Sequence, residues 1–275
     1  MTNKRTITYQ TIIYVVCILL SVIVLVPFIM MFVNSFKGIR ESALFRISLP
    51  KKPTLTNYKT VLSKLYFWRG MRNSLILSIS VTLLVNFTGA MAAFVIQRKN
   101  GILCKWTYYA LFAGIIIPVS IIPTIQLMMQ TRIHNTYIGL ILFYTAVNLP
   151  FTVFLLTGFM KTIPKEIDEA AMIEGCGPFR MFVQLIIPLL KTPLVTSTIV
   201  TITAVWNDFS APFYLISDSK KWPIVISVYN FVSQYYTDWG TVFAFMTLVL
   251  LPVIIVYGFL QRYIIAGLTT GAVKG

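Results

Sequence analysis

Residues 164–188 read PKEIDEAAMIEGCGPFRMFVQLIIP, and this stretch decides how the rest of the chain is interpreted. It holds four of the eight acidic residues of the protein: Glu166, Asp168, Glu169 and Glu174. Long apolar segments lie on both sides, so we expect the stretch to leave the membrane, and it is too short to be a domain. A compact, charged, helix-forming patch on a membrane-embedded body favours a docking surface for another protein.

The composition sets the class of protein. The 275-residue chain is 57% hydrophobic and 11% charged, whereas a soluble domain carries about 25% charged residues. This composition predicts an all-α, polytopic membrane protein in contact with lipid. The net charge of +15 does not indicate a nucleic-acid partner, because the cations flank apolar spans.

Six apolar stretches are long enough to cross a bilayer, which takes about 20 residues of helix. We expect a single transmembrane domain over residues 1–275, with a short two-helix loop at 161–192. Pro118 and Pro123 should kink the third span. The six predicted spans are 11–33, 73–96, 106–130, 137–160, 193–216 and 241–261.

The charges alone do not fix the orientation of the chain. Lysine and arginine are nearly evenly divided between the two sides, so the positive-inside rule gives no clear result. The short loop 97–105, with three cations and no acid, favours a cytoplasmic N-terminus only modestly.

Local signals predict two short helices within the loop. Pro164 suits a first helical turn, and the acidic residues that follow lie near the positive end of the helix dipole. The sequence 175–177, Gly-Cys-Gly, should end this helix near Glu174, and Pro178 can open a second one. Phe179, Phe182 and Ile186 then share one face. From these residues alone, a docking surface and a solvated connector both remain open.

The loop resembles that of a known family. Glu169-Ala170-Ala171, then Gly175 three residues further on, then Leu-Ile-Ile-Pro at 185–188, resembles the EAA loop of permeases of ABC importers. The family pattern ends in Ile, one residue, Leu-Pro, so this chain carries conservative changes at 185 and 187. The resemblance implies that Glu169, Ala170, Ala171, Gly175 and Pro188 contact a separate ATPase.

Two further stretches agree with the resemblance. Trp206-Asn207-Asp208 is similar to a segment of the fifth helix in carbohydrate permeases, and residues 267–275 are similar to the C-terminal tail of MalG-like permeases of maltose-type importers. The resemblance implies that the loop and both termini are cytoplasmic. It implies also that the tail, with Thr269, Gly271 and Lys274, reaches between two ATPase subunits.

The resemblance implies a division of labour in a bacterial cytoplasmic membrane. A pair of ATP-binding subunits would hold ATP and Mg, a second homologous permease would complete the pathway, and an extracytoplasmic binding protein would deliver a sugar, here an oligosaccharide. The chain itself should be no enzyme and carry no cofactor. Its tail GLTTGAVK (267–274) lacks the spacing of a phosphate-binding loop and follows a membrane span rather than a strand.

Asp208 is the one charged residue within a predicted span, and such residues are functional candidates. With Trp206 and Asn207 it offers stacking and hydroxyl-binding groups suited to a sugar. A structural cap or a gate contact is an equally good interpretation. Weaker candidates, each expected to be an interhelical hydrogen bond, are Gln126, Asn148 and Tyr214.

Other classes of function are less well supported. The same machine could carry another polar solute. An ATP-independent secondary transporter or channel would lead us to expect an inverted repeat or intramembrane charges, and a membrane enzyme would need a nucleophile–base pair. The single histidine, His134, and the lack of a His or Cys cluster argue against a metal site.

Overall fold

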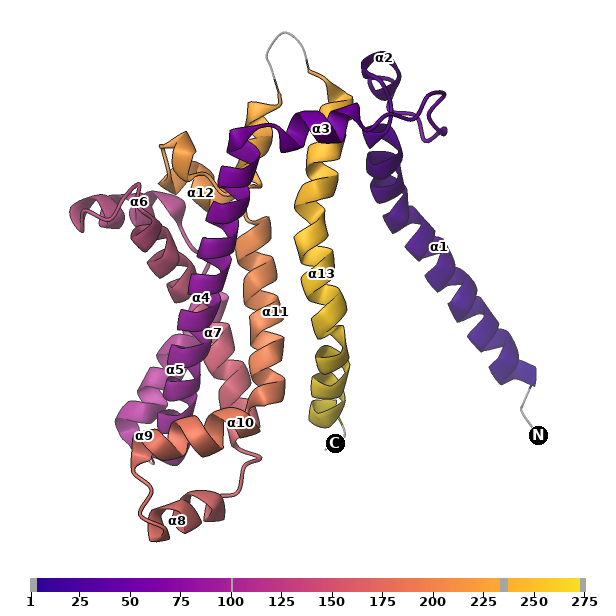
Figure 1. Cartoon of the computed structure of the whole chain (residues 1–275). Coiled ribbons are helices and arrows are strands. Elements are labelled where there is room, and N and C mark those ends of the chain that lie inside the picture. Colours follow the sequence, from indigo (N-terminus) through magenta and orange to yellow (C-terminus); the bar gives the residue numbers. More distant parts are fainter. Residues whose placement is uncertain (1–3, 100, 233–236, 273–275) are drawn as a thin grey trace. The chain divides into compact units, whose positions relative to one another are not determined.

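The computed structural model describes residues 4–99, 101–232 and 237–272. Its regular elements in these ranges are helices, in agreement with the predicted all-α class (Figure 1). The backbone contacts divide the chain into two compact units. One comprises Met1–Trp68 and Val228–Leu251, and the other comprises Arg69–Ser227 and Pro252–Gly275.

The first unit contains a long apolar helix that packs little against the rest of this unit. Helix α1 (Lys4–Ser35) has a span at Tyr9–Ser35, and none of the residues in its most apolar window is buried. After α1 come the short helices α2 (Ile39–Ser42) and α3 (Thr56–Leu62), and the unit closes with the first turns of α13 (Trp239–Ala272). The rest of the first unit therefore leaves the apolar side chains of α1 uncovered.

A buried lysine organises the loop after α1. Lys37 is fully buried, and its Nζ donates to the carbonyl of Arg46 at 2.6 Å and to Asn34 Oδ1 at 3.1 Å. Asn57 donates to the carbonyl of Lys37 at 2.8 Å. A buried charge is tolerated only when it is hydrogen-bonded, so these contacts fix the loop. Gly240 packs closely here, since a Cβ would lie 2.7 Å from Asn57 Nδ2.

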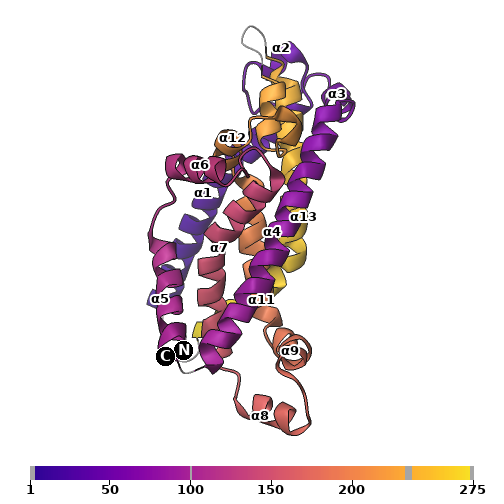
Figure 2. The same cartoon turned by 90° about the vertical axis from the view of Figure 1, so that its left-hand side faces the viewer.

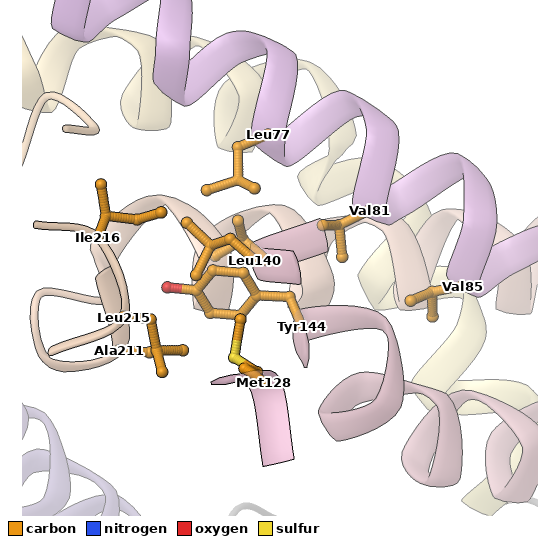
Figure 3. Close-up of a cluster of buried hydrophobic side chains, with 10 residues drawn as sticks. Leu77, Val81, Val85, Met128, Leu140, Tyr144, Ala211, Leu215 and Ile216 are labelled. Atoms are coloured by element: carbon orange, nitrogen blue, oxygen red, sulfur yellow. The ribbon is translucent and has the colours of Figure 1, made fainter. Parts of the chain in front are cut away.

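The second unit is a bundle of apolar helices. Helix α4 (Leu65–Arg98) runs into it from the first unit, followed by α5 (Ile102–Ile116), α6 (Ile121–Gln130), α7 (Tyr137–Met160), α11 (Lys191–Asn207) and α12 (Ser210–Leu215). One buried cluster joins α4, α7 and α12 through Leu77, Leu140, Tyr144 and Leu215 (Figure 3). A second cluster, at the other end of α4 and α7, contains Ala90, Leu156, Met160, Phe182 and Ile186.

Four of the six predicted spans are confirmed as long apolar helices. In the described part of the chain these are Tyr9–Ser35, Leu65–Arg98, Tyr137–Met160 and Trp239–Phe259. A fifth crossing is possible through the pair Pro178–Leu189 and Lys191–Asn207, which is bent by 78°. The count of six is therefore not confirmed.

The predicted third span, 106–130, is wrong as one continuous helix. Helix α5 ends at Ile116, and Ile117 is extended, with φ −77° and ψ 118°. Pro118 follows, and a residue before proline is driven out of the helical region. The proline therefore ends the helix instead of kinking it, and α6 begins anew at Ile121.

The predicted fifth span, 193–216, is also divided. Helix α11 ends at Asn207, and Asp208 has an extended ψ of 120°. A separate short helix, α12, then covers Ser210–Leu215. The side chain of Asp208 bonds the first amides of α12, as described for the site, and this local competition ends α11 early.

The two-helix loop is confirmed. Helix α8 (Glu166–Ile173) and helix α9 (Pro178–Met181) are joined by a turn in which Gly175 has φ +77°. In the second unit, α8 lies beyond the ends of α4 and α7, whereas α9 lies level with the end of α4 (Figure 2). A π turn, η1 (Phe182–Ile186), follows and leads to α10 (Ile187–Leu189).

One detail of the second loop helix was predicted wrongly. Phe182 and Ile186 are buried, whereas Phe179 is 67% exposed, so the three do not share one face. The π turn begins at Phe182, and a π turn changes the angular register of a helix. Met181, Phe182 and Ile186 therefore reach the core, and Phe179 does not.

Candidate functional site

An arginine at the end of α4 holds the loop to the helix bundle. Arg98 Nε lies 2.5 Å from Asp168 Oδ2, and Arg98 Nη2 donates to Asp168 Oδ1 at 3.3 Å. Arg98 Nη1 donates to the carbonyl of Ile163 at 3.2 Å. Both side chains are largely buried, at 12% and 7% exposure. The close ion pair and the two hydrogen bonds from Nη1 and Nη2 together tie α8, and the segment before it, to the last turn of α4.

Sequence reasoning missed this contact. It assigned Asp168 to the helix dipole and gave Arg98 only a place in the charge count. The two residues are 70 positions apart, so neither helical spacing nor a local motif links them. A basic residue at the end of a span and a spare carboxylate in the next loop on the same side were the only available signals.

The predicted ATPase-contact residues do not all face outward. Glu169, Ala170, Gly175 and Pro188 are exposed, whereas Ala171 is 6% exposed and lies on the inner side of α8. The Cβ of Ala171 is therefore a packing group in this structure.

Exposed apolar side chains occupy the tip of the loop. Met172 is 59% exposed, Ile173 is 87% exposed, and Phe179 is 67% exposed. A groove of about 440 Å³ separates α8 from α9, and Ala170, Glu174 and Arg180 are among its lining residues. Apolar side chains gathered on a water-facing loop are typical of an interaction surface. Sequence reasoning singled out the charged and small residues and missed these.

Asp208 makes structural contacts. Its Oδ2 accepts a hydrogen bond from Tyr144 Oη at 2.9 Å, and its Oδ1 accepts from the amides of Ser210 at 2.8 Å and Ala211 at 3.4 Å. Tyr144 lies in the buried cluster between α4 and α7 (Figure 3). The carboxylate thus caps the start of α12 and ties it to α7, which favours the cap among the interpretations left open.

The other substrate-pathway candidates differ in how far they are buried. Trp206 is 3% exposed and cannot stack on a ligand without moving. Asn148 is half-buried and donates to the carbonyl of Tyr144 at 2.8 Å. Asn207, Tyr214 and Gln126 are exposed. The prediction that Asn148 makes an interhelical hydrogen bond is therefore wrong, because its partner is the carbonyl one turn earlier in α7. Three of the candidates remain exposed.

The predicted tail contacts cannot be placed. Lys274 lies outside the described residues. Thr269 and Gly271 belong to the last turns of α13, where only the backbone is described. In the described part of the chain, no group of three or more His, Cys, Asp or Glu side chains could hold a metal ion.

A family profile described as "Binding-protein-dependent transport system inner membrane component" matches residues 85–270. The chain belongs to this family. Membership confirms the resemblance read from the EAA pattern, and with the apolar helices it makes the protein a multi-pass membrane component of a transport system.

Members of this family with similar sequences are named as permeases. A putative ABC transporter permease protein, ORF2 of Caldicellulosiruptor sp., is 37% identical over 254 residues, which cover 91% of this chain and 92% of that protein. The diacetylchitobiose uptake system permease NgcG of Streptomyces coelicolor is 32% identical, over 97% of this chain and 89% of that one. Such components are transport subunits rather than catalysts.

The fold of this family is also found in a solved structure. A bacterial ABC transporter involved in the import of the acidic polysaccharide alginate contains a chain that superposes with a TM-score of 0.85. The superposition covers 96% of this chain and 99% of that one, at 18% sequence identity. At this identity the likeness concerns the fold alone.

Proposed function

We propose that the chain is the permease subunit of an ATP-driven importer that moves an oligosaccharide across the cytoplasmic membrane by alternating access. The single observation that carries the proposal is the loop 161–192, where the EAA pattern coincides with a helix that is tied to the bundle and presents exposed apolar side chains. Relatives support the substrate class, since they include permeases named for diacetylchitobiose, starch degradation products and multiple sugars.

In this proposal α8 docks on a separate ATPase that binds ATP and Mg. Glu169, Ala170 and Gly175 belong to the contact, together with the apolar tip at Met172 and Ile173. Ala171 supports α8 from below, and Pro188 helps to set the bend at α10. The chain itself hydrolyses no nucleotide.

Two links would carry motion of α8 into the membrane. The first is the pair between Arg98 and Asp168, which leads into α4. The second is the π turn, whose Phe182 packs against Phe94 of α4, with ring centroids 5.6 Å apart. Both links reach the same helix, so closure of the ATPases would rotate or shift α4 as a rigid rod. The helices lining the pathway would follow.

The proposed transporter contains further subunits. A dimer of ATP-binding subunits, a second homologous permease and an extracytoplasmic sugar-binding protein would surround this chain, with the loop and both termini cytoplasmic. The C-terminal tail, with Thr269, Gly271 and Lys274, would reach between the ATPases. The unburied apolar face of α1 suits a membrane-embedded neighbour. We assign three exposed polar side chains to the sugar pathway: Asn207, Tyr214 and Gln126. Asp208 and Trp206 would support them from less exposed positions.

Reconstitution tests the proposal. The tagged chain would be purified gently from its native membrane, its companions identified, and the assembly placed in liposomes with its binding protein and labelled maltooligosaccharides or chitooligosaccharides. We expect an ATPase and a second permease, and uptake that requires ATP. A chain that purifies alone and transports without ATP would replace the proposal with a secondary transporter or channel.

A further inference from the structure

Three lysines from different elements line one groove near the two-helix loop. Here α4 and α7 end and α5 begins. Lys99 follows α4, Lys105 lies in the first turn of α5, and Lys161 follows α7. They line a groove of about 290 Å³ together with Tyr108 and Tyr109 of α5. Among the described residues, none that lines this groove is acidic. The groove therefore carries three positive charges without an anion to match them.

An apolar groove continues from this basic groove. It has a volume of about 830 Å³ and shares Tyr108, Thr157 and Lys161 with its basic neighbour. Its other walls include Phe154 and Leu189, which are 43% and 50% exposed. The two grooves thus form one continuous surface, with lysine side chains at one end and mainly apolar side chains at the other.

A buried hydroxyl lies at the junction of the two grooves. Thr157 is 3% exposed, and its Oγ1 has no hydrogen-bond partner in the described part of the chain. A buried hydroxyl without a partner costs free energy. Thr157 lines both grooves, so a ligand oxygen at the junction would supply the missing partner.

The side chains around the grooves are those of a membrane interface. Trp106 and Tyr109 of α5 are 67% and 60% exposed, and such amphipathic rings gather at the level of lipid headgroups. In the described residues, the ammonium groups of Lys99, Lys105 and Lys161 have neither a salt bridge nor a hydrogen bond. Basic pockets between membrane helices on the cytoplasmic side bind anionic lipid headgroups.

We propose that these two grooves form one binding site for an anionic phospholipid. The phosphate would lie among Lys99, Lys105 and Lys161, an ester or glycerol oxygen would accept from Thr157 Oγ1, and an acyl chain would lie along Phe154 and Leu189. The site adjoins the point where the loop leaves α7, so an occupied site would brace the base of the loop. The proposal that an anionic phospholipid binds here does not depend on the proposed function. Only the assignment of the site to the cytoplasmic leaflet rests on that function.

Native mass spectrometry of the purified, delipidated chain tests the site. The chain, alone and in its complex, would be exposed to equal amounts of dioleoyl phosphatidylglycerol and dioleoyl phosphatidylcholine. We expect one tightly retained phosphatidylglycerol in both preparations. Each lysine near an anionic lipid contributes about fivefold to affinity, so replacing Lys99, Lys105 and Lys161 together by glutamine should weaken retention about 100-fold.

Matched variants separate the site from general charge. Replacing Lys51, Lys52 and Lys64, which are exposed lysines of the first unit, by glutamine removes the same charge and should leave retention unchanged. Thr157→Val keeps the shape of the side chain and removes its hydroxyl, and should weaken retention about fivefold.

Four results would overturn the proposal. These are equal retention of the two lipids, a triple variant at 99, 105 and 161 that retains phosphatidylglycerol like the unchanged chain, displacement of the lipid by inorganic phosphate, and loss of the lipid when the complex assembles. The third result would indicate a site for small anions. The fourth would indicate that another subunit covers the grooves. None of these results requires transport, so the lipid site and the proposed importer can fail separately.

Discussion

The guanidinium of Arg98 forms an ion pair with the carboxylate of Asp168, and the two residues are 70 positions apart in the chain. Arg98 ends a membrane helix and Asp168 lies in the exposed loop, so the pair is a direct polar link between α8 and α4. Breaking a largely buried ion pair by removing one partner costs about 3 kcal/mol, because the other charge is left unpaired. Loss of either partner should therefore loosen the attachment of α8 to α4.

Arg98→Met should uncouple the loop from α4. We expect uptake to fall at least tenfold, while the chain remains in the membrane and still binds its ATPase, since the exposed tip of α8 is unchanged. ATP hydrolysis and uptake, measured on the same proteoliposomes, would show hydrolysis without transport. Arg98→Lys should be intermediate, because lysine cannot hold the carboxylate and the carbonyl of Ile163 in one planar fork.

The control for this prediction is Arg40→Met. Arg40 is exposed and lies in α2 of the first unit, outside the loop, so the same change there should leave the ratio of uptake to hydrolysis near normal. The double variant Arg98→Met with Asp168→Leu removes both charges and should recover part of the uptake. Normal coupling in Arg98→Met alone would show that the pair has no role in transmission.

Glu169→Lys should abolish uptake without unfolding the chain. Glu169 is exposed on α8, so the substitution disturbs no packing and acts only on the proposed contact with the ATPase. Co-purification should show loss of the ATPase, with the second permease retained. Glu166→Lys reverses the same charge one turn earlier on an equally exposed position, and it should cost far less; equal losses from both variants would point to net charge rather than a contact at 169.

How much of this could be foreseen depends on the range of the interactions. Apolar run length predicted six spans, and four of them are long apolar helices in the described residues. Pro178 with Gly175 predicted the two loop helices, because those signals are local. Ile117 ends α5 since Pro118 acts on its neighbour, yet the pattern of apolar residues continues across the break. The ion pair of Arg98 has no local signal at all, because only packing of α4 against the loop brings its partner within reach.

Gly175 is required for its backbone angle and not for space. Its φ is +77°, and a Cβ built on it would meet nothing within 4 Å. A β-branched residue with positive φ costs about 1–2 kcal/mol, so Gly175→Val should distort the turn between α8 and α9 and reduce uptake several-fold. Gly175→Asn should be tolerated better, since asparagine visits this region more readily.

The neighbouring glycine provides the comparison for this turn. Gly177 has φ −67°, and a Cβ there would also meet nothing within 4 Å. Gly177→Val should therefore have little effect in the same uptake assay. If the valines at 175 and 177 reduced uptake equally, bulk at the docking surface, and not the turn, would explain the loss.

Asp208 should prove to be a cap rather than a sugar ligand. Asp208→Asn keeps an oxygen that can accept from the amides of Ser210 and Ala211, so we expect the KM for sugar uptake to change less than about threefold. Asp208→Leu removes the acceptor from both amides and from Tyr144, and losing these bonds should cost about 1–3 kcal/mol of stability. A lower Tm of the purified complex would report that loss. Tyr144→Phe removes only the bond to Oδ2 and should lower Tm by less than Asp208→Leu does. A large rise in KM for Asp208→Asn, with Tm unchanged, would instead place the carboxylate on the sugar.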